Sequence, residues 1–131
     1  MGEKIPLATL PVPSTSLLDY PLFEHPGGNA RLTFKFERDS VTVLGGLQFE
    51  RVRAFRFRTE GHVTAWHVDS AYDTLVEITD SDWVNELLAA EPPESWGHWH
   101  IKHYMIYIDS AGCYELGAQS WSWMVEKHLS L

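Results

Sequence analysis

A strict alternation of apolar and polar side chains in the first third of the chain restricts its fold more than any other feature. Between residues 31 and 37 every second side chain is large and apolar: Leu32, Phe34 and Phe36. A period of two places all three on one face of a β-strand and their polar neighbours on the other. A turn over 38–40 and a second strand over 41–44 follow, so an antiparallel meander is expected to begin here.

Two irregularities interrupt this pattern after residue 44. Gly45 and Gly46 predict a break before a third strand over 47–58. Within that strand the alternation changes phase, because Phe49 and Val52 fall on opposite parities. A β-bulge near residues 53–55 would restore the phase.

The later strands follow from composition and turn signals. Residues 64–67 and 72–78 are rich in β-branched and aromatic side chains, which favour a strand over a helix. Two long strands are expected over 98–108 and 113–124, and the turn residues 109–112 predict that they form a hairpin.

One helix is predicted, from Ser81 to Ala90. Ser81 is an N-cap candidate, Asp82 is an acidic residue of the first turn, and apolar residues then recur at spacings of three and four. The prolines at 92 and 93 end it. The sequence therefore predicts an α+β fold: a single curved, mostly antiparallel sheet of about six or seven strands, with one main helix (about 81–90) on one face.

The first 30 residues have a different composition from the rest. They hold five of the seven prolines, so they cannot sustain a helix or a central strand. They also contain several leucines that would be exposed in a disordered tail. We expect residues 1–30 to form an extended arm docked on a single α+β domain that comprises residues 31–131.

Length and charge narrow the class of protein. The 131 residues, 44% of them hydrophobic, suffice for one independently folding domain. The formal net charge of −8 argues against binding to nucleic acid or to an anionic membrane surface. A single cysteine cannot form an internal disulfide, and the first residues lack the apolar run of a signal peptide, so we expect a cytoplasmic protein.

The histidines allow a metal site without requiring one. His98 and His100 lie two apart and would project from one face of a strand, about 6–7 Å apart. A third ligand would have to come from His62 or His67. The alternative, which we favour, is that these histidines are amphipathic residues of a half-buried sheet face, and no cofactor is expected.

Other catalytic groups are weakly indicated. Cys113 follows a turn and has no cation or helix N-terminus beside it in the sequence to activate it, so it is expected to be a small apolar residue rather than a nucleophile. Asp73 and Glu77 would lie about 13 Å apart on a strand, too far for an acid/base pair. We therefore expect no catalytic residue.

The distribution of charge is more informative. Residues 59–101 contain nine acidic residues and no lysine or arginine, which makes one side of the protein acidic. Arginines at 51, 53, 56 and 58 either pair with this stretch or form a separate basic patch. Tryptophans within the acidic stretch are candidate anchors for a protein partner. The predicted partner-binding residues are Asp69, Asp73, Asp80, Asp82, Trp83, Glu86, Glu91, Glu94 and Trp96.

Five runs stand out in the C-terminal two-thirds of the chain: VRAFR (52–56), AWHV (65–68), AYDTLVE (71–77), SDWV (81–84) and HYMIYIDSAGCYE (103–115). On these runs, residues 47–123 resemble a set of small bacterial proteins associated with the immunity proteins of polymorphic-toxin and contact-dependent inhibition systems. The resemblance implies a small, non-catalytic cytoplasmic protein that binds and neutralises a toxin domain. Many such domains act on nucleic acid and must be basic, which would suit an acidic inhibitor.

Two alternatives remain open from the sequence. One is a self-associating module, in which the proline-rich arm reaches a second copy and tryptophans are buried in a homodimer interface. The other is a metal-dependent or small-molecule enzyme centred on His67, His98, His100 and Cys113.

Overall fold

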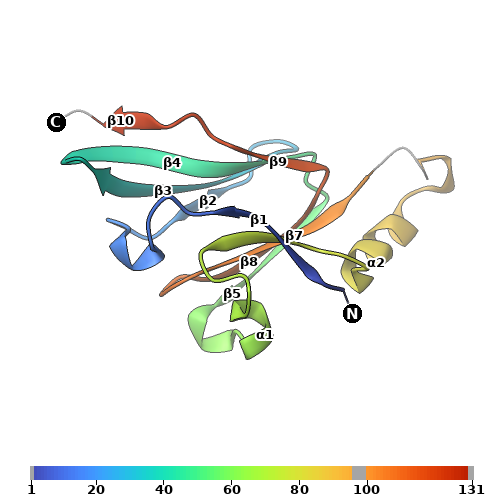
Figure 1. The fold of residues 1–131 in the computed structure, drawn as a ribbon. Coiled ribbons are helices and arrows are strands. Elements are labelled where there is room, and N and C mark those ends of the chain that lie inside the picture. Colours follow the sequence, from blue (N-terminus) through green and yellow to red (C-terminus); the bar gives the residue numbers. More distant parts are fainter. Residues whose placement is uncertain (1, 96–99, 130–131) are drawn as a thin grey trace.

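Two antiparallel sheets, each of five strands, replace the single sheet predicted from the sequence (Figure 1). The computed structural model describes residues 2–95 and 100–129. Sheet A has the order β1-β6-β7-β8-β5, and its strands are Lys4–Thr9, Thr74–Ile78, Lys102–Ile108, Gly112–Ala118 and Ala54–Thr59. Sheet B has the order β10-β4-β3-β2, with strands Lys127–Leu129, Val41–Glu50, Ala30–Arg38 and Leu22–Glu24, and β9 (Ser120–Trp123) also pairs with β4. The α+β class holds.

The two sheets face each other across the main core. From sheet B, β3 and β4 contribute the large side chains Leu32, Phe34, Phe36, Leu47 and Phe49. From sheet A, β7 and β8 contribute Tyr104, Ile106, Ile108 and Leu116. Each such side chain stabilises the fold by about 1.5–3 kcal/mol when it leaves water. The alternation over residues 31–37 therefore has the predicted cause, a strand with one buried face.

The two α-helices lie on the side of sheet A that faces away from sheet B (Figure 1). Helix α2 (Asp82–Ala90) confirms the predicted helix, and Ser81 caps it by accepting the N–H of Val84 at 3.1 Å. Helix α1 (Ala65–Val68) lies where a strand was predicted. That prediction was wrong because Thr64 and His67 form a capping box, which closes one helical turn despite the β-favouring composition. Short 3-10 turns occupy Ser14–Ser16, Glu60–His62 and Pro93–Ser95.

The predicted break at Gly45 and Gly46 is absent, because β4 runs through both residues. A Cβ atom at Gly45 would lie 3.2 Å from the Phe34 ring, and one at Gly46 would lie 2.8 Å from the Leu32 carbonyl oxygen. The glycines therefore allow close approach of a neighbouring strand and its rings, and they do not mark a turn.

The chain changes sheets at three places: between β1 and β2, between β4 and β5, and between β8 and β9. The last two explain why one sheet was predicted. After β4, Arg51 adopts a left-handed backbone (φ 53°), and β5 begins at Ala54 in the other sheet. The expected bulge at 53–55 is thus a crossing between sheets. The predicted hairpin of 98–108 with 113–124 is confirmed for β7 and β8, in register from Ile108 and Gly112 to Lys102 and Ala118. Beyond Gln119 the chain returns to sheet B as β9, and residues 98 and 99 lie outside the described residues.

The first 30 residues contribute one edge strand to each sheet. Strand β1 pairs with β6, and its register shifts between Pro6 and Ala8. Strand β2 pairs with β3 at the edge of sheet B. Leu10, between them, is buried in the main core. Of the five prolines only Pro6 lies in a strand, and that strand, β1, is an edge, where a missing N–H is tolerated.

Candidate functional site

The acidic residues predicted to bind a partner do not form one surface. Four of them lie exposed on helix α2 or beside it: Asp80, Asp82, Glu86 and Glu94. We call these four the acidic helix end. Asp82 and Glu86 are four residues apart, so they share one side of the helix. Within residues 2–95 and 100–129, no ion pair involves any of the four.

The other predicted partner-binding residues have contacts within the fold or lie outside the described residues, and one of them, Glu91, is the C-cap of α2. Asp69 follows α1, and Lys4 donates to its carbonyl oxygen at 2.7 Å. Asp73 is buried and accepts the backbone N–H of Ser14 at 2.9 Å, so it serves the structure of the N-terminal segment. Glu91 forms an ion pair with Arg53 at 3.5 Å. Trp96 lies outside the described residues.

Trp83 is half-buried and anchors α2 to sheet A. Its ring lies 4.1 Å from the Arg56 guanidinium carbon and meets the His103 ring edge-on, with centroids 5.0 Å apart. Cation–π and edge-to-face contacts of this kind hold the indole in place. Trp83 is therefore a packing residue, and the helix presents its carboxylates from a fixed base.

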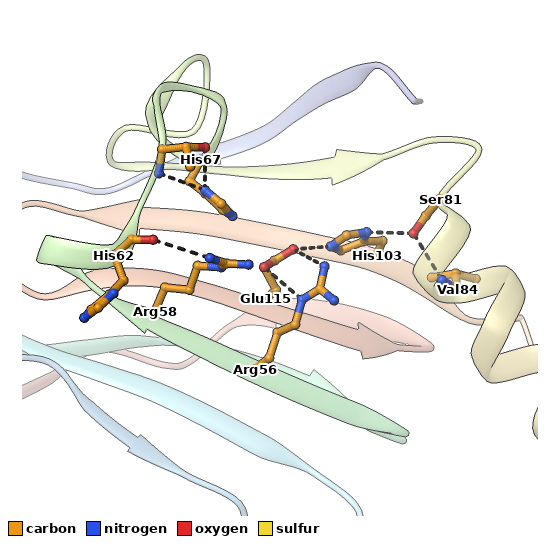
Figure 2. Close-up of polar contacts among 9 residues, drawn as sticks. Arg56, Arg58, His62, His67, Ser81, Val84, His103 and Glu115 are labelled. Atoms are coloured by element: carbon orange, nitrogen blue, oxygen red, sulfur yellow. Dashed lines mark hydrogen bonds and ion pairs between the residues drawn. The ribbon is translucent and has the colours of Figure 1, made fainter.

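A buried polar network beneath α2 was missed by the sequence analysis (Figure 2). Glu115, on β8, is only 1% exposed. One carboxylate oxygen, Oε1, lies 2.8 Å from His103 Nε2 and 3.1 Å from an Arg56 terminal nitrogen. The other, Oε2, accepts from Arg56 Nε at 3.0 Å. His103 Nδ1 lies 2.8 Å from the Ser81 hydroxyl, which links the network to the helix cap.

Strand register assembles this network. Arg56 is directly opposite Glu115 in the pairing of β5 with β8, and His103 is opposite Gly117, two residues further along β8. Residues two apart on a strand share a face, so all three project from the outer face of sheet A. The signal available in the sequence was Glu115 itself, a lone charge in the run Cys-Tyr-Glu-Leu-Gly-Ala, because a buried charge requires a partner.

Each polar group of this network has a hydrogen-bond partner, and Glu115 is ionised. Burial alone would raise the pKa of Glu115, but hydrogen bonds from His103 and Arg56 outweigh it and lower this pKa to about 2. His103 Nε2 donates to the Glu115 carboxylate, which can only accept, and His103 Nδ1 shares a hydrogen bond with the Ser81 hydroxyl. Ser81 in turn accepts the Val84 N–H. Every group has a partner, so the network fixes α2 on sheet A.

The groups that could act as nucleophiles have structural roles. The Ser81 hydroxyl is buried and serves as a helix cap. Cys113 is buried, and burial raises the pKa of its thiol to about 12, which keeps it protonated and unreactive. Asp73 lies just before β6 in a left-handed backbone conformation (φ 54°), whereas Glu77 lies within β6.

The histidines are distributed rather than clustered in the described part of the chain. His67 Nδ1 accepts the Thr64 N–H at 3.0 Å, and burial lowers the pKa of this imidazole. His103 belongs to the network, His100 is exposed, and His98 lies outside the described residues. Within residues 2–95 and 100–129, no three His, Cys, Asp or Glu side chains are placed to hold a metal ion.

A second feature missed from the sequence is an aromatic pocket at one open edge of the two sheets. Its volume is about 480 Å³, and its walls come from β5, β8 and the chain around β2. The side chains of Phe55 and Phe57 are each 46% exposed. The lining residues are Pro21, Phe23, Phe55, Arg56, Phe57, Tyr114 and Glu115.

Of the 51–58 arginines, Arg53 pairs with Glu91 of the acidic stretch, as one alternative expected, whereas Arg56 pairs with Glu115, which lies outside that stretch. Arg58 donates to the His62 carbonyl oxygen at 3.4 Å.

Comparison with known proteins assigns no family to the chain: no family model, curated protein or solved structure matches it. No helix in the described residues has the length and apolar character needed to span a membrane.

Proposed function

We propose that this chain is a non-catalytic binding protein that neutralises a basic protein domain, in the manner of the immunity proteins that its sequence resembles. The observation that supports the proposal is the acidic helix end. Its four carboxylates are exposed, and none forms an ion pair within the described residues. A cationic partner surface would find them available and would be steered toward them by their field.

The attachment of α2 supports this role. Ser81 caps the helix, Trp83 packs on Arg56 and His103, and Leu87 packs so closely on Gly117 that a Cβ there would lie 2.7 Å from it. A helix held at three points loses little conformational entropy when a partner binds. Rigid presentation of charge is what a fast and specific inhibitor requires.

Charge reversal at the acidic helix end tests the proposal. The double variant Asp82→Lys with Glu86→Lys is compared with a control, Glu37→Lys with Glu60→Lys. All four side chains are exposed, and each pair raises the formal net charge of −8 by the same amount. Tagged proteins are used to capture partners from lysate of the source cells, and the affinity of a captured protein is then measured at several salt concentrations.

We expect capture of a protein with a basic domain by the wild type and the control. The Asp82/Glu86 variant should bind that domain at least tenfold more weakly, a loss of about 1.4 kcal/mol or more, with unchanged thermal stability. Equal affinity of both double variants, or an affinity that does not fall with salt, contradicts the proposal.

A further inference from the structure

The edge of sheet A formed by β5 carries a separate inference. We propose that this edge binds an extended segment of another protein, in which apolar side chains alternate with acidic ones. The segment would pair with β5 as a sixth strand, placing its apolar side chains beside the aromatic pocket and its carboxylates beside Arg56 and Arg58. This site uses residues outside the acidic helix end, so it does not depend on the function proposed above.

Among the described strands, β5 is the edge least protected against pairing. Strand β1, at the other edge of sheet A, contains Pro6 and a register shift. On sheet B, β2 and β10 are only three residues long. Proline, irregularity and shortness are the usual means by which proteins block sheet edges. Strand β5 has six residues, no proline, and five exposed positions out of six.

The two faces of β5 have different chemistry. Phe55 and Phe57 project toward Phe23 and Tyr114: Phe55 lies 4.9 Å from Phe23, and Phe57 lies 4.7 Å from Tyr114, between ring centroids. The pocket of about 480 Å³ lies beside them, at the edge where a sixth strand would pass. An added strand would therefore bring every second side chain to this pocket, the usual basis of side-chain specificity in β-strand addition.

The opposite face of β5 is cationic. Arg56 is half-exposed even though it pairs with Glu115, and Arg58 has no carboxylate partner within the described residues. On an added strand, the residues directly opposite these two would be favoured as acidic, because opposite charges across a strand pair stabilise it. The resulting pattern is apolar toward the pocket and acidic toward the arginines.

A second copy of this chain is a poorer occupant. Two identical antiparallel strands are related by a two-fold axis perpendicular to the sheet, so each residue opposes one from the same face. In the registers that pair most of β5, an arginine at 56 or 58 would oppose an arginine of the other copy. Like charges in that position destabilise the pair. The arginines thus favour a different, acidic strand over self-pairing.

The test uses a defined probe: an acetylated and amidated heptapeptide in which valine or phenylalanine alternates with glutamate. Binding is followed by fluorescence anisotropy of a labelled peptide and by amide hydrogen exchange of the protein. One control peptide has lysine in place of glutamate, and another has a central proline, which removes a backbone donor. Protein variants are Arg58→Glu and the matched control Lys35→Glu, an exposed charge on β3 of sheet B.

We expect saturable binding of the glutamate peptide, with slower exchange of amides in β5. The lysine and proline peptides should bind at least tenfold more weakly. The Arg58→Glu protein should bind the glutamate peptide at least tenfold more weakly than the wild type does, and the Lys35→Glu protein should bind it equally well. The Asp82→Lys/Glu86→Lys protein should bind the peptide as the wild type does, so failure at one site is distinguishable from failure at the other.

Several outcomes overturn the inference. These are no saturable binding, equal binding of the lysine peptide, protection confined to strands other than β5, and an unchanged affinity in Arg58→Glu. Concentration-dependent dimerisation of the free protein with protection of β5 also overturns it, because the edge would then serve self-association.

Discussion

At the scale of single residues, Glu115 holds Arg56 and His103, the residues of sheet A that Trp83 and Ser81 contact. Replacing it with glutamine removes the charge that Arg56 and His103 face in a buried site. Breaking such a pair leaves Arg56 and His103 without a charged hydrogen-bond acceptor, although water can hydrate the half-exposed Arg56 in part. We expect Glu115→Gln to lower the free energy of unfolding by about 2–3 kcal/mol, measured by urea denaturation.

Glu126→Gln provides the matched control for this prediction. Glu126 binds Arg38 through both carboxylate oxygens, at 2.6 and 3.1 Å, but on an exposed surface. Water screens that pair, so its loss should change stability far less. If both substitutions lower the free energy of unfolding equally, the buried contacts of Glu115 stabilise the protein no more than an exposed ion pair does.

At the scale of elements, a substitution tests whether β4 contains glycine because the neighbouring strand approaches it closely. A Cβ at Gly46 would lie 2.8 Å from the backbone oxygen of Leu32 and 2.7 Å from Met124 Sδ. Because the neighbouring strand cannot move away without breaking its ladder, we expect Gly46→Ala to destabilise the protein by about 1–3 kcal/mol. Gly61→Ala has open space around it and should stay within about 0.5 kcal/mol of the wild type. If both variants unfold at the same urea concentration as the wild type, close strand approach does not explain Gly46.

The same elements show which information the sequence contains. Local signals were sufficient for α2, where Ser81 caps a regular apolar pattern, and for the hairpin of β7 with β8. They failed at α1, where the His67 side chain completes a cap. They also failed at Arg51 and Gln119, where the chain crosses between sheets, because strand alternation does not record which sheet a strand joins.

The candidate sites also differ in how far they can be predicted from the sequence. The exposed carboxylates around α2 could be predicted, since acidic residues on a helix beside turns are usually exposed. The contact of Arg56, His103 and Glu115 could not, because strands 12 to 59 residues apart in sequence bring them together. The pocket between β5 and β2 likewise depends on how two sheet edges meet.

At the scale of the whole molecule, stability should depend on pH through two opposing contributions. The formal net charge of −8 means that protonating exposed carboxylates relieves repulsion as the pH falls. Glu115 acts in the opposite direction. Its pKa is lowered from 4.5 to about 2 in the folded protein, so the unfolded chain binds a proton there first. Its contribution is therefore complete above pH 4.5 and is lost as the pH falls toward 2.

Comparison of the wild type with Glu115→Gln separates the two contributions, because both proteins share nearly all their other carboxylates. The difference in unfolding free energy, measured in urea from pH 7 to pH 2.5, should be largest above pH 5 and should shrink steadily below it. Its full size above pH 5 should be the loss of about 2–3 kcal/mol expected for Glu115→Gln. A difference that stays constant over this range would mean that the loss in Glu115→Gln comes from packing. A shrinking difference would establish that an ionised Glu115 holds α2, and with it the acidic helix end, on sheet A.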